Sequence, residues 1–366
     1  MRRYFFVLIG LLLLAAGLAK TQDRPKHSHV IDDSSQYKLG DKIMDNIERS
    51  FQVTSGGRLT IDSDWGSIDV QTAERDGVDA LIKRGIKAAD DKRAEEILKD
   101  LEITFEQDGS DVKIEAKFKQ GRKYWQNDLN RLKILFSVTV PEKYHVDLRT
   151  AGGSISVADL EGEVRSQTAG GNLHFGKING PVWGRTSGGN IELKSCSGDA
   201  DVNTSGGNIE VGNVGGQVKA KTSGGNLRFG EVKGSVWGRT SGGSIKLKSC
   251  DGDVDVKTSG GNIDIGDVNG DVKAITSGGS IKAHLLRQPK KDCFLKTSGG
   301  SVTVSLPSDV AVNINAKTSS GRVSSDFPVT GTLKKNQLQG TINGGGPLLQ
   351  LLTSAGSIRL RKEESE

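Results

Sequence analysis

Short runs of alternating hydrophobic and polar residues, each introduced by glycine, fill most of this chain. In TSGGNIEVGNVGGQVKAK, residues 204–221, Ile209 and Val211 form one apolar pair and Val218 and Ala220 form a second. Val214, between the pairs, is a fifth apolar candidate for the interior. Alternation with a period of two predicts strands with one buried face, and glycine predicts tight turns with positive φ. The segment therefore predicts two short strands and two turns, which make one coil of a β-solenoid.

This coil belongs to a series that repeats mainly every 18 residues. A block of three coils is also duplicated, because TAGGNLHFGKINGPVWGR (168–185) recurs as TSGGNLRFGEVKGSVWGR (222–239). Such a period predicts stacked coils about 4.8 Å apart. Hexapeptide coils with three faces are excluded, because apolar positions do not recur every six residues. The threonines that open successive coils lie 18 residues apart and then 21 apart, before a last TSAGSIRLRK near Thr353: Thr150, Thr168, Thr186, Thr204, Thr222, Thr240, Thr258, Thr276, Thr297 and Thr318.

Stacking would align equivalent positions into columns. The fifth position of each coil is Asn or Ser, as in Asn190, Asn208 and Asn226, and such a column can pair side chain to side chain along a stack. Opposite charges also meet between coils, as at Glu210 and Arg228. Each exposed pair should contribute only a few tenths of a kcal/mol, so we expect these pairs mainly to fix the register.

The part before the repeat has a different pattern. Residues 54–71 match one coil, after which residues 73–86, 110–118 and 134–141 alternate as strands. DDKRAEEILKDL places Ala94, Ile97, Leu98 and Leu101 on one face of a short helix. We therefore predict an all-β, single-stranded β-solenoid with 18-residue coils of two short strands, and one short helix near the N-terminus. The expected parts are a signal peptide (1–19), a flexible leader (20–48), an N-terminal cap (49–149), solenoid repeats (150–318), C-terminal coils or cap (319–362) and a tail (363–366).

Composition supports a folded chain and excludes some classes. Of 366 residues, 49 are Gly and only 7 are Pro, which does not fit collagen, and the 34% hydrophobic content is too regularly patterned for disorder. The formal charge of +5 is modest, and no basic–aromatic patch indicates nucleic acid.

The first twenty residues, MRRYFFVLIGLLLLAAGLAK, have the organisation of a secretory signal peptide: two Arg, an apolar run, then small residues. An uncleaved membrane anchor is the alternative, although the run from Tyr4 to Leu18 is shorter than the ~20 residues that span a bilayer. After cleavage we expect no membrane span.

The glycine pairs do not indicate a phosphate loop, because they open strands and not a helix. The calcium nonapeptide is a closer match, but its third Gly and following Asp are missing. Asp199, Asp201, Asp253 and Asp255 lie near turns and could offer oxygen ligands to calcium, or could be solvated turn residues. We predict no bound metal and no cofactor.

Three cysteines in an exported chain raise the question of a disulfide. Cys196 and Cys250 occupy the eleventh position of their coils, where other coils carry Val, Leu or Ile. They lie three coils apart, about 14 Å, whereas a disulfide needs Cα atoms within about 7 Å. We predict buried thiols without a Cys196–Cys250 bond, and no obvious partner for Cys293.

Two tryptophans are the candidate binding residues. Trp183 and Trp237 fall at outward positions, where they could stack on a sugar or anchor a partner. Alternatively, each covers its neighbouring glycine and packs over adjacent coils, against Lys219 for example. The five His and the Ser residues form no catalytic set, so no enzyme is predicted.

Several features together resemble a known bacterial family. They are the expected signal peptide, the interrupted first coil, the strand ending in Val140-Pro141, the T-[SA]-G-G-[NS]-[IL] coils and the closing TSAGSIRL. This combination, over about residues 50–362, resembles the bacterial putative-adhesin family of β-strand-repeat domains, whose function is unknown. The resemblance implies a β-helical, exported or envelope-associated protein and supplies no catalytic residues.

We therefore expect a non-enzymatic surface or envelope protein with adhesin-like binding to a protein or polysaccharide of the cell envelope, in the periplasm or at the cell surface. One alternative is a structural or regulatory periplasmic protein that acts through a protein partner. Another is a carbohydrate-active enzyme, in which a cleft should bring carboxylates together.

Overall fold

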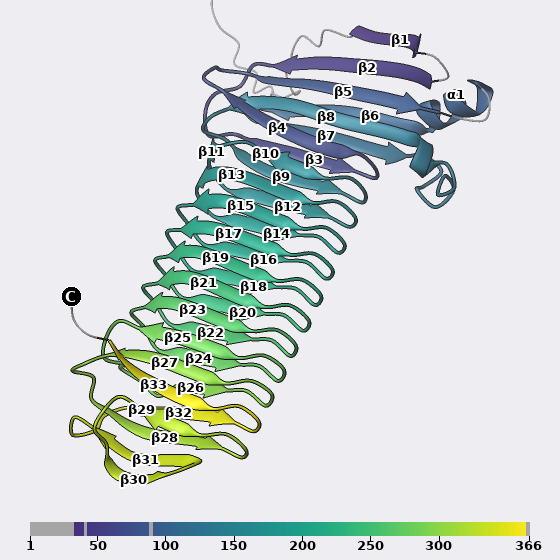
Figure 1. Ribbon diagram of the computed structural model, residues 1–366. Helices are drawn as coiled ribbons and strands as arrows, with labels where there is room; N and C mark the ends of the chain where they lie inside the picture. The colour runs from purple at the N-terminus through teal and green to yellow at the C-terminus, as the bar shows by residue number, and fades with distance from the viewer. Residues whose placement is uncertain (1–32, 40–41, 88–90, 364–366) are drawn as a thin grey trace, which may run out of the picture.

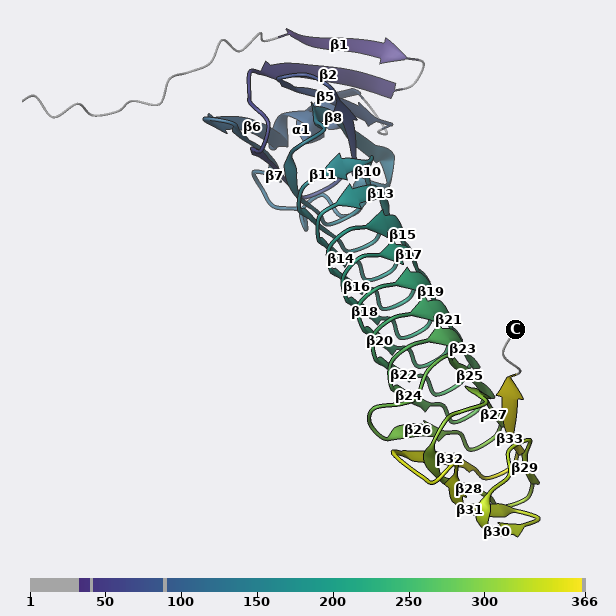
Figure 2. The ribbon, with the colours of Figure 1, turned by 90° about the vertical axis from the view of Figure 1, so that its left-hand side faces the viewer.

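The computed structural model describes residues 33–39, 42–87 and 91–363. Two long sheets face each other along an elongated solenoid, with a broader cap at the N-terminal end (Figures 1 and 2). The predicted all-β solenoid is therefore confirmed. The predicted signal peptide lies outside the described residues.

Sheet A carries one strand of each coil. Its first members pair antiparallel, and from β8 onward the strands pair parallel. In spatial order the strands are β1 (Asp33–Leu39), β2 (Lys42–Phe51), β5 (Val78–Ile86), β8 (Leu132–Pro141), β4 (Ser67–Ala73), β10 (Ile155–Val157), β13 (Leu173–Asn179) with β11 (Leu160–Glu161) beside it, β15 (Ile191–Cys196), β17 (Ile209–Val214), β19 (Leu227–Val232), β21 (Ile245–Cys250), β23 (Ile263–Val268), β25 (Ile281–Leu285), β27 (Val302–Pro307), β33 (Ile358–Glu363) and β29 (Val323–Ser325).

Sheet B carries the other strand of each coil and is antiparallel only at its two ends. In spatial order its strands are β6 (Leu101–Asp108), β7 (Asp111–Phe118), β3 (Arg58–Ser63), β9 (His145–Thr150), β12 (Val164–Thr168), β14 (Val182–Arg185), β16 (Ala200–Asn203), β18 (Val218–Lys221), β20 (Val236–Arg239), β22 (Val254–Lys257), β24 (Val272–Ile275), β26 (Cys293–Lys296), β32 (Leu348–Thr353), β28 (Val312–Thr318), β31 (Gln337–Ile342) and β30 (Thr330–Lys334).

The coils stack in the register that the 18-residue period predicts. Ile209 pairs with Leu227, and Val218 pairs with Val236, each one period apart. Ile209, Val211 and Val214 are buried, as are the second apolar pair. The alternation of the sequence therefore identifies the inward face correctly.

Facing positions of the core have complementary sizes. Phe175 faces Gly184 across the core, and the next coil of the same block has Leu193 with Val202 at these positions. The duplicated block repeats this arrangement with Phe229 and Gly238. A large side chain from sheet A thus needs a small one from sheet B, because protein interiors are close-packed.

From the coil that begins at Thr168 onward, the glycine pairs serve close approach between coils and not positive φ, which corrects the predicted reason for them there. Earlier in the chain, Gly56 and Gly153 do have positive φ. Between residues 170 and 300 only Gly180 has a positive φ, and it lies in the other turn. A Cβ on Gly207 would lie 2.1 Å from the carbonyl oxygen of Gly189 one coil earlier, whereas a Cβ on Gly206 would lie 3.3 Å from the nearest oxygen. The second glycine of the pair is therefore the one that stacking requires.

Two hydrogen-bonded ladders run along these turns. The buried Thr222 donates from Oγ1 to the carbonyl oxygen of Gly207 at 2.8 Å, and the other repeat threonines do the same. In the Asn column, Asn208 Oδ1 accepts from the backbone N–H of Asn226 at 2.8 Å. The predicted ladder exists, but it joins side chain to backbone, with one additional amide–amide bond between these two residues.

Chain order and spatial order differ at both ends of the solenoid. The first coil, β3 and β4, lies between the β7–β8 pair and the β9–β10 pair. At the other end, β32 lies between β26 and β28, and β33 lies between β27 and β29. The last coil in the sequence is therefore not the last coil of the stack.

The N-terminal cap departs from one prediction and agrees with another. Residues 33–39 and 42–51 form paired strands, so the expected flexible leader to residue 48 is wrong for this part. The predicted helix is present as α1 (Asp91–Asp100), and Ala94, Ile97 and Leu98 are buried. A short 3-10 helix, η1 (Leu129–Arg131), precedes β8.

Candidate functional site

Trp183 and Trp237 lie on the outer face of sheet B, in β14 and β20, and both are half-buried. Each pairs one coil away with an Asp, Trp183 with Asp201 and Trp237 with Asp255. The neighbouring glycines, Gly184 and Gly238, point into the core, so the tryptophans do not cover them. That part of the packing alternative is wrong.

Each tryptophan is held by an arginine of its own strand. The guanidinium carbon of Arg185 lies 4.7 Å from the centroid of the Trp183 ring, and Arg185 Nη2 lies 2.8 Å from Asp201 Oδ1 of the next coil. The duplicated block repeats this arrangement with Arg239, at 4.5 Å from Trp237. Lys219 Nζ also lies 5.8 Å from the Trp237 ring, a contact that the packing alternative anticipated. Such cation–π contacts contribute about 0.5–1 kcal/mol at exposed sites and fix the ring orientation.

The aromatic column continues beyond the two tryptophans. Phe294 in β26 lies three coils after Trp237 in the same column, and it is half-buried like the tryptophans. In this column, toward the C-terminal end of the solenoid, the residue one coil before each aromatic residue is an Arg or Lys, and the residue one coil after it is an Asp or an amide. The amide is Gln350, which β32 brings next to Phe294 although it is 56 residues away in the sequence. The aromatic residues thus recur every three coils, or about 14 Å.

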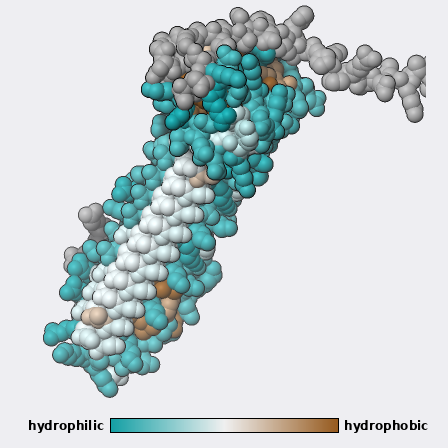
Figure 3. Space-filling view, turned by 90° about the vertical axis from the view of Figure 1, so that its right-hand side faces the viewer, coloured by the Kyte–Doolittle hydropathy of each residue, from teal (hydrophilic) through white to brown (hydrophobic). Residues whose placement is uncertain are grey.

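The outer face of sheet B is more hydrophobic toward the C-terminal end of the solenoid than along the rest of its length. Figure 3 shows a pale stripe along the turns and a brown area beside it toward the C-terminal end. Ile275, Phe294 and Leu352 are half-buried at outward positions of neighbouring strands there. Sequence reasoning missed Phe294 and Leu352, because the insertions near Cys293 and Thr318 shift them away from the 18-residue count.

Exposed lysines occupy the same face. Five of them have no ion pair within the described part of the chain, although Lys219 contacts the Trp237 ring. The arginines of the face, in contrast, are paired with acids. We call the strip made by these lysines and the aromatic column the basic–aromatic strip: Lys219, Lys221, Lys257, Lys273 and Lys296 with Trp183, Trp237 and Phe294. The sequence alone indicated no such patch, because these residues come together only through the stacking of successive coils.

An acidic edge runs beside this strip. A shallow groove of about 570 Å³ separates the aromatic column from the turn that carries Asp199 and Asp253. Asp199 Oδ1 accepts the backbone N–H of Gln217 at 2.7 Å, and Asp253 Oδ1 accepts that of Asp271 at 3.0 Å. The N–H of Asp271, and then Lys291, lower the pKa of Asp253. These carboxylates connect successive coils.

The calcium alternative finds no support in this arrangement. Asp201 and Asp255 pair with the two arginines that hold the tryptophans, and Asp199 and Asp253 accept backbone N–H groups. Within residues 33–39, 42–87 and 91–363, no group of three or more His, Cys, Asp and Glu is placed to hold a metal ion.

The three cysteines are free and buried, so the prediction of no Cys196–Cys250 bond is confirmed. Cys196 lies between Ile178 and Val214 in the core column, as predicted. Burial raises the pKa of Cys196 to about 12 and those of Cys250 and Cys293 to about 11. Neutral, enclosed thiols of this kind are poor nucleophiles.

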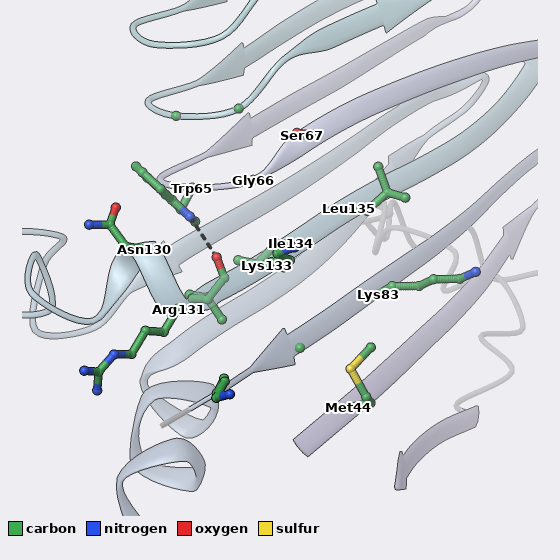
Figure 4. Close-up of a pocket in the computed structure, with 15 residues that line it drawn as sticks. Met44, Trp65, Gly66, Ser67, Lys83, Asn130, Arg131, Lys133, Ile134 and Leu135 are labelled. Atoms are coloured by element: carbon green, nitrogen blue, oxygen red, sulfur yellow. Dashed lines mark hydrogen bonds between the residues drawn. The ribbon is translucent and has the colours of Figure 1, made fainter. Parts of the chain in front are cut away.

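A second hollow lies in the N-terminal cap, and sequence reasoning missed it entirely. It has a volume of about 770 Å³ (Figure 4). Met44, Gly85 and Lys133 form one row across β2, β5 and β8, and Lys83 and Leu135 belong to the next row. Gly85, which has no side chain, lies between Met44 and Lys133 in this row. No sequence period connects these strands, so no pattern could have brought the residues together.

The fold and this face define a β-solenoid with a repetitive outer surface. A family model described as Toastrack DUF4097 matches residues 56–361, and the chain belongs to this family. None of the described helices is long and apolar enough to cross a membrane.

The solved structures that this chain matches are distant. A putative cell adhesion protein from Clostridium sporogenes is 14% identical, with 87% of this chain and 100% of that chain covered and a TM-score of 0.21. A putative adhesin from Parabacteroides merdae is 12% identical, with 86% and 95% covered and a TM-score of 0.34. A putative lipid binding protein from Parabacteroides distasonis is 13% identical, with 87% and 97% covered and a TM-score of 0.26. At these values the likenesses carry no argument about function, and the comparison with curated proteins gives no match.

Proposed function

We propose that this protein is a non-enzymatic, exported binding protein of the cell envelope, and that its basic–aromatic strip binds an extended acidic polysaccharide. The observation that carries the proposal is the row of five unpaired lysines beside aromatic residues that recur every three coils. A polymer with repeated carboxylates can contact several of these units at once, which raises its avidity without any deep pocket.

The chemistry of the strip fits such a ligand. Lysine ammonium groups attract carboxylates, and half-buried aromatic rings offer an apolar surface to sugar rings. The acidic edge at Asp199 and Asp253 would repel a polyanion, and so it confines the ligand to one side of the groove.

Binding of polygalacturonate to the full-length chain tests the proposal. We expect saturable binding that strengthens with chain length, weakens between 50 and 200 mM salt and exceeds binding of neutral dextran. A Lys221→Gln/Lys257→Gln/Lys273→Gln variant and a Trp183→Ala/Trp237→Ala variant should each bind less tightly. A Lys246→Gln/Lys282→Gln variant, changed on the outer face of sheet A, is the matched control and should bind normally.

Three results would contradict the proposal. They are equal binding by the strip variants and the control, equal binding of dextran, and equal binding of single-stranded DNA, which would show attraction to negative charge alone. Cell fractionation with protease shaving tests the localisation separately, because it distinguishes the cell surface from the periplasm.

A further inference from the structure

The hollow in the N-terminal cap combines partly exposed apolar side chains with two lysines, Lys83 and Lys133, that form no ion pair with any described residue. Leu135 is 39% exposed although it is hydrophobic, and Met44 and Trp65 are half-buried. Lys83 and Lys133 are exposed and have no ion pair in the described part of the chain. Elsewhere in the cap, cations of the neighbouring strands are paired, as Arg84 is with Asp45.

The shape of the hollow depends on close backbone approach at its rim. The Trp65 indole donates from Nε1 to the carbonyl oxygen of Leu132 at 3.2 Å, which fixes the ring (Figure 4). A Cβ on Gly152 would lie 2.3 Å from this ring, and one on Gly66 would lie 2.8 Å from Ile134 Cβ. The rim is therefore formed by the Trp65 ring and by two positions without side chains, and the hollow is part of the packed structure.

We propose that this hollow binds a single-chain acidic lipid, of which a long-chain fatty acid is the simplest. The alkyl chain lies over Met44, Trp65 and Leu135, and the carboxylate lies between Lys83 and Lys133. Charge complementarity selects this ligand, because the described residues of the lining include two ammonium groups without an ion pair, Lys83 and Lys133, the additional cations Lys87 and Arg131, and no Asp or Glu. The proposal is independent of the basic–aromatic strip on sheet B.

Calorimetric titration of the full-length chain with dodecanoate tests this site. We expect saturable binding with one site, weaker binding of octanoate, and little binding of dodecyltrimethylammonium, which has the same tail and the opposite charge. A Lys83→Gln/Lys133→Gln variant should bind at least about tenfold more weakly. A Leu135→Asp variant should also lose binding, because it replaces apolar surface under the alkyl chain with a charge and places a competing carboxylate opposite Lys83.

Two matched variants keep the test interpretable. Lys83→Arg/Lys133→Arg retains both charges and should bind dodecanoate, which separates charge from folding. Lys246→Gln/Lys282→Gln, on the solenoid, should bind like the unchanged chain. The proposal is overturned by unsaturable binding, by equal binding of the cationic detergent or by normal binding in the Lys83→Gln/Lys133→Gln variant. Equal binding of a peptide with the sequence of residues 4–18 would assign the hollow to the chain's own N-terminal segment and would also overturn it.

Discussion

Phe229 lies against Gly238 across the core of one coil. A Cβ added to Gly238 would lie 3.4 Å from Phe229 Cε2 and 3.3 Å from Val256 Cγ1 of the next coil. Contacts this close leave room for hydrogen but not for a larger side chain, so the two positions are matched in volume.

A Gly238→Val variant should therefore lower stability by about 1–3 kcal/mol through overpacking. A Phe229→Leu/Gly238→Val variant recreates the pair that the chain already has at Leu247 and Val256, and it should recover most of the loss. The measurement is the melting midpoint of the unchanged chain and of both variants under one set of conditions, in which the double variant should melt closer to the unchanged chain than Gly238→Val does. Additive losses in the double variant would contradict the volume match.

The threonine ladder gives a second prediction. Thr222→Val keeps the shape of the side chain but removes the bonds to the Gly207 carbonyl and the Gly225 N–H. Leaving buried polar groups without partners should cost about 1–3 kcal/mol. Ser223→Ala, at the neighbouring exposed position, is the control and should change stability by less than about 0.5 kcal/mol. An equal effect of the two substitutions in thermal unfolding would argue against the ladder.

The buried ion pair of the cap gives a third prediction. Arg84 pairs with Asp45, and its Nη1 also donates to the carbonyl oxygens of Leu98 and Leu101 at 3.2 Å, which ties α1 to the sheet. Asp45→Ala leaves a buried charge unpaired and should destabilise the cap by about 3–5 kcal/mol. Asp45→Leu/Arg84→Leu should lose less than the sum of its single variants. Hydrogen exchange of β2 and β5 measures the effect locally, and unchanged protection there in Asp45→Ala would contradict it.

The cysteines give a prediction about reactivity. Because burial raises the pKa of Cys250 and Cys293 to about 11 and that of Cys196 to about 12, each stays a neutral thiol at pH 8. The folded protein should therefore react with a disulfide reagent at far less than one equivalent in the time in which the urea-unfolded chain reacts with three. Rapid labelling of Cys250 in the folded protein would show that its coil opens readily.

The regular part of the fold could be predicted because its signal is redundant. Every coil repeats the same apolar positions, so the burial of Val214 or Cys196 follows from many equivalent positions. The meeting of Phe294 with Gln350 could not be predicted in this way, since it depends on where the chain returns after an insertion. The strand at residues 42–51 was missed because its inward Asp45 is polar, and only the structure shows that Arg84 compensates it.

The same distinction, between features that repeat in every coil and features that depend on the fold, applies to the candidate sites. Trp183 and Trp237 were recognised from their outward column, whereas the arginines that hold them were not, because a cation–π contact depends on side-chain conformation. Met44, Lys83 and Lys133 come from three strands whose neighbours are far apart in the sequence. No periodic pattern connects them, and so the hollow in the cap required the fold.

The insertion of β32 and β33 between earlier coils has a consequence for biosynthesis. A chain that emerges from its N-terminus can add coils one by one as far as β27, but β28 and β29 cannot dock there, because the coil that separates them from β26 and β27 is made after them. The exposed edges of β26 and β27 must wait for β32 and β33, residues 348–363, with the closure of a long loop as the slow step. A nascent chain that has not yet reached β32 and β33 would thus present open strand edges, the kind of surface that chaperones and proteases recognise, and the docking of these two strands would be what removes that signal.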